Sequence, residues 1–249
     1  LLTGKDLVRW KYQRYMQDYL ACVQGVDDSV GEVLDYLDRT GLGKNTVVIY
    51  STDNGWYLGD LGMYDKRFMY EPGLHIPLLA RGPGIKSGLV TDLFAVNADF
   101  APTFLEMAGL SVPPDMHGRS LVPVLRGEKP ANWRTSAYYR YYHDPGHHNT
   151  RAHYGVRTAT HKLIHYWKKD AWEMFDLVAD PTEQRNLAGD PRHAATLASL
   201  KTELKRLQQE LGDTGQFADA IPRDGVDAPV NVPVLGNKTV AEAIAATRR

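Results

Sequence analysis

The stretch NTVVIYSTDNG, residues 45–55, is where the fold of this chain is decided. It joins a short run rich in β-branched residues to the turn signal Asp53-Asn54-Gly55. Such a run, bounded by polar turn residues at both ends, predicts a strand that is buried on both faces. Strands of that kind are typical of parallel sheets covered by helices, so we expect a parallel strand here.

The segments around this strand alternate between helical and extended patterns. Tyrosine and aliphatic residues recur at helical spacing from about residue 9 to residue 37, which predicts an amphipathic helix. A second apolar run covers residues 76–84, and we expect a short helix over residues 97–110. Helices that alternate with buried strands indicate an α/β sandwich.

The character of the sequence changes after residue 130. Aromatic-rich, alternating segments predict the antiparallel strands of a second, smaller sheet over residues 136–176. Leucines on one face predict an amphipathic helix over residues 191–213. We therefore expect three parts, namely an α/β half over residues 1–130, an antiparallel subdomain with a packed helix over residues 131–225, and a tail over residues 226–249.

The composition excludes several classes of protein. The chain has 249 residues, of which 43% are hydrophobic, and this suffices for a substantial core. The net charge of −1 and the pI of about 6.8 lack the basic excess of a nucleic-acid-binding protein. No apolar run is long enough to span a membrane. Cys22 is the only cysteine, so no intrachain disulfide forms, and its helical context predicts a small buried hydrophobe.

An acid and an amide stand at the end of the predicted strand. In open α/β sheets, ligands gather at the carboxyl ends of the strands, and Asp53 and Asn54 lie at such an end. A carboxylate and an amide carbonyl are hard oxygen ligands, which suit Ca²⁺ or Mg²⁺ rather than Zn²⁺. The alternative is that Asp-Asn-Gly is only a turn, and the tripeptide by itself favours the turn.

A cation follows in the same loop. Lys66 stands in the triplet Asp65-Lys66-Arg67, after a loop that contains Gly59 and Gly62. Such a loop can fold back and place an ammonium beside a bound ion, and the two cations together stabilise an anionic ester and its leaving oxygen. By itself, the triplet fits a solvated run of surface charges better.

These residues belong to a longer pattern that resembles a known family. The stretch STDNGWYLGDLGMYDKRFMYEPGLHIPLLARGPG, residues 51–84, is similar to the second half of the catalytic domain of type I sulfatases. The stretch HGRSLVPVLRG, residues 117–127, and the segment from HYGVRT to EQRNL, residues 153–187, are similar to later parts of the same family. The resemblance runs from about residue 15 to residue 211. It implies the second half of an alkaline-phosphatase-like α/β sandwich followed by a C-terminal subdomain.

The resemblance also implies roles for residues around the predicted metal corner. Asp53 and Asn54 match two ligands of the family's metal ion, which is usually Ca²⁺, with Mg²⁺ as the less common choice. Lys66 matches the lysine that binds the sulfate group and the bridging oxygen of the ester. The resemblance therefore implies hydrolysis of sulfate esters.

The residues beside Lys66 narrow the implied substrate. Asp65 and Arg67 resemble the residues that hold sugar hydroxyls in sulfatases acting on 6-O-sulfated N-acetylglucosamine, where the acid accepts and the arginine donates as a rigid fork. His153 matches the histidine that completes this sugar pocket, and the alternative is a packing role at a strand edge. A sulfated glycan or sugar is therefore the expected substrate.

The chain departs from the family pattern in two places. Leu61 stands where many relatives carry a histidine, which we interpret as a difference in shape. More importantly, no C/S-x-P-S-R motif for a formylglycine occurs, and Cys22 does not fit that motif. We therefore interpret the chain as a C-terminal piece of a sulfatase. The formylglycine and the remaining metal ligands are expected in a preceding half of the catalytic domain, and we expect no sulfatase activity from this chain alone.

Two other functions stay open at this point. One is a phosphoryl or phosphonate ester hydrolase of the same superfamily, although Asn54 in place of a second acid favours sulfate and a single ion. The other is a non-catalytic module that binds glycans through the sugar pocket. The family resemblance also implies a periplasmic, secreted or lysosome-like compartment.

Overall fold

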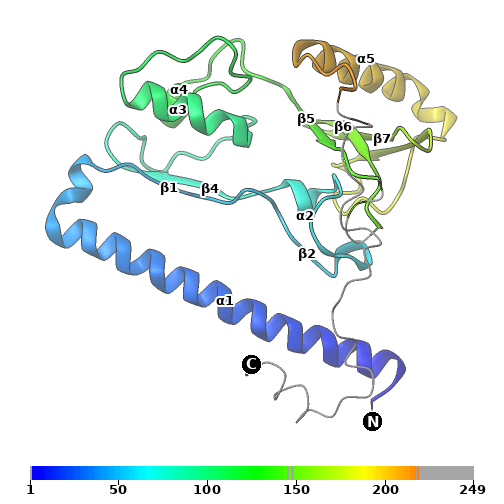
Figure 1. Cartoon of the computed structure of the whole chain (residues 1–249), viewed down its shortest axis with the longest axis horizontal. Coiled ribbons are helices and arrows are strands. Elements are labelled where there is room, and N and C mark those ends of the chain that lie inside the picture. Colours follow the sequence, from blue (N-terminus) through cyan, green and yellow to red (C-terminus); the bar gives the residue numbers. More distant parts are fainter. Residues whose placement is uncertain (1, 145, 147–148, 217, 219–249) are drawn as a thin grey trace.

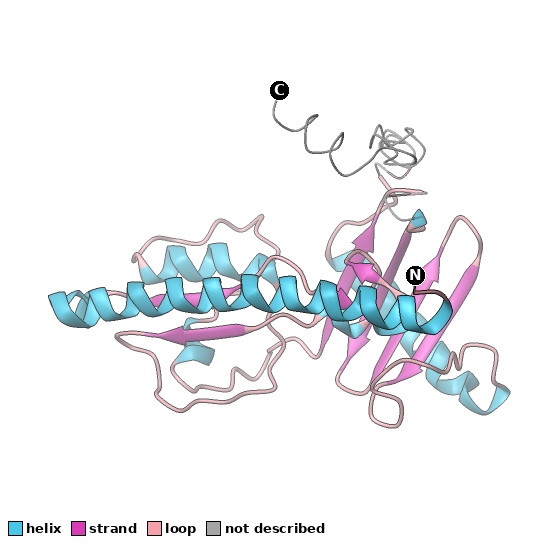
Figure 2. Ribbon diagram, turned by 90° about the horizontal axis from the view of Figure 1, so that it is seen from below, coloured by secondary structure: helices cyan, strands magenta, loops and turns pink. Residues whose placement is uncertain are grey.

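The computed structural model describes residues 2–144, 146, 149–216 and 218. The predicted tail, residues 226–249, lies outside the described residues. Figure 1 shows two parts side by side, one built around the strands β1 and β4 and the other around the strands β5 to β8. The long helix α1 runs past both parts, which Figure 2 shows from below.

Helix α1, Gly4–Thr40, is longer than predicted and buries none of its residues. It ends at Gly41, whose φ of 74° is the left-handed conformation that glycine adopts without a steric penalty. Cys22 lies on this helix and is exposed, so the expectation that it is buried was wrong. The exposed apolar side chains of α1 are Val8, Trp10, Tyr12, Leu20, Val23, Val26, Val33 and Tyr36.

The predicted strand exists, but its partner and its burial differ from the prediction. After the short helix η1, Leu42–Asn45, strand β1, Val48–Ser51, pairs antiparallel with β4, Leu78–Arg81. The side chains of β1 are half-buried or exposed, and Leu79 of β4 is 62% exposed. The sequence pattern reports only that a strand is apolar enough to be covered on both faces. It does not report the direction of the neighbouring strand, and in the described part of the chain β1 and β4 form a sheet of two strands.

The segment between β1 and β4 carries the predicted site. It contains β2, Tyr57–Leu58, η2, Asp60–Gly62, and β3, Tyr64–Asp65, followed by the short helix α2, Glu71–Leu74. β2 and β3 pair antiparallel, so this loop folds back on itself as the glycines predict. Tyr57 is fully buried and holds the returning limb, because its hydroxyl donates to the carbonyl of Phe68 at 2.9 Å.

The helical segment after β4 consists of η3, Asn97–Asp99, α3, Phe100–Met107, and α4, Val122–Leu125. Asp99 is fully buried and links this segment to later parts of the chain. Its carboxylate accepts from the backbone N–H of Val96 at 2.9 Å and of Arg119 at 2.8 Å, and it pairs with Arg134. These donors satisfy the hydrogen-bonding capacity of the buried carboxylate, which offsets the cost of removing it from water.

The second part is a four-stranded antiparallel sheet, which confirms the strands predicted there. Its strands are β5, Ser136–Tyr141, β6, His153–Thr158, β7, His161–Tyr166, and β8, Ala171–Asp176, in that order across the sheet. Helix α5, Ala194–Glu210, follows η5, Pro191–His193, and covers one face. Leu200, Leu204 and Leu207 of α5 pack on Val156 and Leu163. This sheet has more strands than β1–β4, so the second sheet is not the smaller one within this chain.

The other face of this sheet packs against the segment that contains α2. Met69, which is fully buried, lies in a cluster with Ile164 and Phe175. The approach is close at Gly155, where an added Cβ would lie 2.5 Å from Met69 Sδ. The residues next to the predicted site are thus packed on the second sheet. No helix in the described part of the chain is both long and apolar enough to cross a membrane.

Candidate active site

The acid and the amide of the predicted metal corner follow β1 directly. Asp53 is exposed and Asn54 is half-buried. The backbone carbonyl of Asp53 accepts a hydrogen bond from Asn97 Nδ2 at 2.8 Å, which ties this corner to η3. Asn54 Nδ2 donates to the carbonyl of Gly55 at 2.7 Å, so the amide nitrogen is bonded within the turn.

The triplet 65–67 follows with an unusual backbone. Asp65 has a φ of 84° and Arg67 a φ of 104°, so two non-glycine residues on either side of Lys66 occupy the left-handed half of the map. Each such residue costs on the order of 1–3 kcal/mol, and strain of this kind concentrates at functional sites. The surrounding structure must therefore hold this triplet in place.

The ammonium of Lys66 lies over an aromatic ring. Its Nζ is 5.0 Å from the centroid of the Trp56 ring, and its side chain is 39% exposed. Trp56 is held in turn by α1, because its indole N–H donates to the hydroxyl of Tyr15 at 2.7 Å. A cation over the face of an indole is attracted by the ring quadrupole. Lys66 is thus both positioned and accessible to an anion.

The two neighbours of Lys66 interact with each other. The guanidinium of Arg67 pairs with the carboxylate of Asp65, which also lies 3.9 Å from Lys66 Nζ. The side chains of Asp65 and Arg67 are only 15% and 20% exposed. The Tyr139 hydroxyl donates to the Arg67 carbonyl at 2.6 Å, and burial raises the pKa of Tyr139 to about 12, so this hydroxyl remains protonated.

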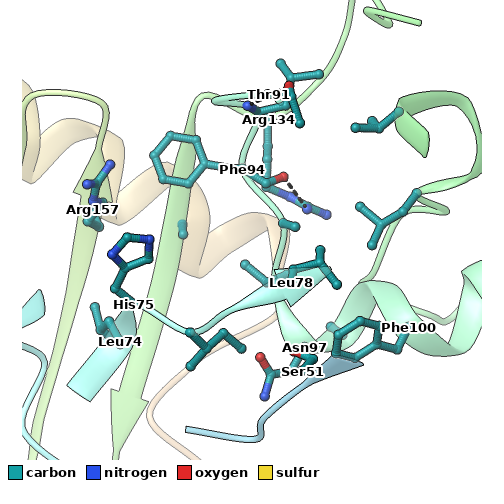
Figure 3. A pocket seen from close by; sticks show the side chains of 18 of the residues that line it. Ser51, Leu74, His75, Leu78, Thr91, Phe94, Asn97, Phe100, Arg134 and Arg157 are labelled. Atoms are coloured by element: carbon teal, nitrogen blue, oxygen red, sulfur yellow. Dashed lines mark hydrogen bonds between the residues drawn. The ribbon is translucent and has the colours of Figure 1, made fainter. Parts of the chain in front are cut away.

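Four of the six predicted site residues line one cavity of ≈ 2200 Å³, namely Asp53, Asn54, Lys66 and Arg67. Its walls come from α1, β1, β4, the segment before α3 and strand β5. Figure 3 shows part of this lining, where the guanidinium of Arg134 donates to the Phe94 carbonyl. The structure therefore brings the predicted metal corner and the predicted sulfate-binding cation to the same space.

His153 lies outside that lining. It is fully buried, and its ring packs against those of Phe68, Tyr139, Tyr141 and Tyr166. Its Nδ1 bonds the Arg151 carbonyl at 2.7 Å, so Nδ1 carries the proton and Nε2 is an acceptor. Nε2 has no hydrogen-bond partner among the described residues. Burial lowers the pKa of His153 to about 4, and the imidazole is therefore neutral at pH 7.

The donor set at the metal corner fits part of a Ca²⁺ site. Asp53 and Asn54 offer hard oxygens, whereas Ca²⁺ takes 6–8 oxygen ligands. Among the described residues, no group of three or more His, Cys, Asp or Glu side chains is placed to hold a metal ion. Asp53 and Asn54 are therefore at most part of the ligand set that a Ca²⁺ ion at this corner would need.

The sequence did not reveal the side chains that position the candidate site residues. Trp56 and Asn97 contact predicted residues directly, but nothing in their sequence context marks them. Tyr139 belongs to a strand that begins far along the chain, so its contact with the triplet is visible only in the fold. The one signal available was that tyrosines and tryptophans are unusually frequent in these segments.

The chain thus places a carboxylate and an amide directly after β1 and a partly exposed lysine in the lining of one cavity. Comparison with known proteins gives the family. Residues 4–110 match the family described as sulfatase, and residues 59–210 match the one described as N-sulphoglucosamine sulphohydrolase, C-terminal. The chain belongs to the sulfatase family and forms the second part of its alkaline-phosphatase-like fold.

Individual relatives agree with this. An N-acetylglucosamine-6-O-sulfatase of Bacteroides thetaiotaomicron is 46% identical over 85% of this chain, but only 39% of that protein is covered. A solved structure of a protein in complex with its substrate D-glucosamine-2-N,6-O-disulfate has a TM-score of 0.83 and 46% identity, over 86% of this chain and 44% of that one. A phosphonate monoester hydrolase from Silicibacter pomeroyi has a TM-score of 0.67 and 31% identity, over 74% and 38%. The chain thus spans less than half the length of these relatives.

Proposed function

We propose that this chain supplies the second half of the active site of a sulfatase whose substrate is the 6-O-sulfate of N-acetylglucosamine in glycans. The observation that carries the proposal is the accessible Lys66, held between Asp65 and Arg67 in the cavity that Asp53 and Asn54 also line. A relative solved with a 6-O-sulfated glucosamine is 46% identical to this chain over the part that aligns, which supports the same substrate class.

The roles of the individual side chains follow from their chemistry. Lys66 binds the sulfate group and donates a proton or a hydrogen bond to the bridging oxygen as it leaves. Asp65 and Arg67 exchange their mutual contact for hydroxyls of the sugar. Nε2 of His153 accepts from a further hydroxyl once the rings around it move apart. Ca²⁺, when bound with Asp53 and Asn54 among its ligands, would neutralise charge on the sulfate oxygens.

The proposal assigns the nucleophile to the half of the domain that precedes this chain in its relatives. There, a formylglycine and the remaining metal ligands complete the site. That half would dock on the apolar residues that α1, β1 and β4 leave exposed, because such a large apolar surface marks an interaction site. The family also supports a periplasmic, secreted or lysosome-like compartment for the complete protein.

The test is sulfate release from N-acetylglucosamine-6-sulfate by the complete protein and by this chain alone, each with Ca²⁺ and with a chelator. We expect turnover only from the complete protein with Ca²⁺, and a loss of at least about a hundredfold for Lys66→Ala, since it removes a preorganised transition-state contact. Lys44→Ala is the matched control, because Lys44 is exposed on η1. Robust metal-dependent turnover by the chain alone would contradict the proposal.

A phosphonate or phosphate ester hydrolase is the second candidate, because the relative from Silicibacter pomeroyi is 31% identical to this chain over the part that aligns. The same protein samples should therefore be assayed with a phosphonate monoester. A higher kcat/KM for the phosphonate than for the sulfated sugar would favour this candidate. Glycan binding by the complete protein without turnover of either ester would favour a non-catalytic module.

A further inference from the structure

Shortly after the strained triplet, Glu71 belongs to a largely buried cluster of charged side chains. Lys162 of β7 is fully buried, and its Nζ lies 2.8 Å from Glu71 Oε1 and 2.6 Å from Glu183 Oε1. The second oxygen of Glu183 accepts from the backbone N–H of Glu71 at 2.6 Å. Arg157 of β6 pairs with the other side of Glu71, at 3.2 Å. Two carboxylates and two cations thus pair, with Lys162 and Glu183 buried and the side chains of Glu71 and Arg157 21% and 27% exposed.

This cluster joins three segments that are distant in the sequence. Glu71 opens α2, Lys162 lies in β7, and Glu183 lies in the turn after β8 with a φ of 55°. The side chains of Lys162 and Glu183 are 0% and 1% exposed. Burial opposes the charge on Glu71, yet Arg157 and Lys162 outweigh it and lower its pKa. Removing one member of such a cluster leaves an uncompensated buried charge.

The stretch between the triplet and the cluster has an anchor at each residue. The Arg67 carbonyl is held by Tyr139 at 2.6 Å and the Phe68 carbonyl by Tyr57 at 2.9 Å. Met69 is fully buried against the sheet. The ion cluster comes next along the chain, and it attaches Glu71 to β6 and β7.

We propose that Lys162 and Glu183 are positioning residues of the sulfate-ester site, acting through Glu71 to fix residues 65–71 on the second sheet. The strained backbone on either side of Lys66 is kept in place because the segment after it cannot shift. This inference rests on the proposed function for its catalytic consequence. The structural part of the inference, that residues 65–71 are held on the second sheet, does not depend on the proposed function.

The first measurement is amide hydrogen exchange of this chain with Lys162→Met and with Glu183→Gln. Lys162→Met keeps the length of the side chain and removes the charge, and Glu183→Gln is the milder change in case the first variant fails to fold. Lys205→Met is the control, because Lys205 is exposed on α5. We expect exchange to rise by about tenfold or more in residues 65–71 while β5 to β8 and α5 keep their protection.

The second measurement is steady-state kinetics of the complete protein with the same variants, per mole of folded enzyme. A misplaced Lys66 stabilises the leaving oxygen less, so we expect kcat to fall by about tenfold to a hundredfold and KM to change much less. Unchanged exchange in residues 65–71, or an equal rise across the whole sheet, would overturn the proposal. So would an unchanged kcat in an active enzyme. If the wild-type protein releases no sulfate while the exchange result holds, the proposed function fails and the positioning contact stands.

Discussion

His153 combines complete burial with a ring nitrogen that accepts no hydrogen bond from the described residues. Its pKa falls from 6.5 to about 4 on folding, so the unfolded chain binds more protons between these two pH values. Stability is therefore complete above pH 6.5 and decreases as the pH falls toward 4, by about 3 kcal/mol for this group alone. Below pH 4 the contribution of His153 changes no further.

The prediction is that His153→Gln flattens this part of the pH dependence. Urea unfolding at pH 7.0 and at pH 4.5 measures the free energy of unfolding for both proteins. We expect the wild type to lose more stability than His153→Gln between the two values. His75→Gln replaces an exposed histidine and should lose as much stability as the wild type between the two pH values. Equal losses for all three proteins would mean that His153 is not held neutral by burial.

Trp56 gives a second prediction at this scale. Trp56→Leu removes the ring that lies 5.0 Å from the Lys66 ammonium. A contact of this kind is worth about 0.5–1 kcal/mol at an accessible site, so the affinity of the complete protein for N-acetylglucosamine-6-sulfate should fall roughly two- to fivefold. Calorimetric titration measures this. Trp10→Leu, on an exposed part of α1, should leave the affinity unchanged, and a similar loss there would show that the effect of Trp56→Leu is not local.

Among the elements, the segment after β3 and the strand β6 pack closely at Gly155. A Cβ at Gly155 would lie too close to the Leu163 carbonyl oxygen and 2.5 Å from Met69 Sδ. Gly155→Ala should therefore lower the free energy of unfolding by about 1–3 kcal/mol, as overpacking does in other cores. Thermal unfolding of Gly155→Ala and Gly189→Ala measures it, because nothing lies within 4 Å of a Cβ at Gly189. Equal stability of the two variants would contradict the packing described here.

Elements also show what the sequence could predict and what it could not. The alternation in residues 136–176 predicted the antiparallel strands correctly, because period-two patterns report one covered face. The apolar run at residues 47–51 predicted a strand but not its antiparallel partner β4, since strand direction depends on the path of the chain between the two. The candidate site residues could be selected from a family pattern, whereas the Glu71–Lys162–Glu183 cluster could not, because its members are charged residues whose burial appears only in the folded chain.

On the scale of the whole molecule, the exposed apolar residues of α1 lead to a prediction about assembly. Val26 is 50% exposed and lines the cavity, so it should become covered when the preceding half of the domain docks. Burying a valine is worth about 1.5–3 kcal/mol, and Val26→Lys should therefore weaken docking by roughly ten- to a hundredfold. Titrating the separately produced preceding half into this chain measures the affinity. Val178→Lys, at an exposed residue after β8, should have no effect, and equal losses in both would argue against docking on α1.

Because Cys22 is exposed, a dye attached to it would allow that assembly to be measured directly. It is the only thiol in the chain, it is exposed, and it lies on the helix that we expect the missing half to cover. A single maleimide dye would therefore attach at one known place without any engineering of the protein. Its emission should shift as water is excluded around α1, so this thiol is a labelling site from which docking of the proposed preceding half can be followed.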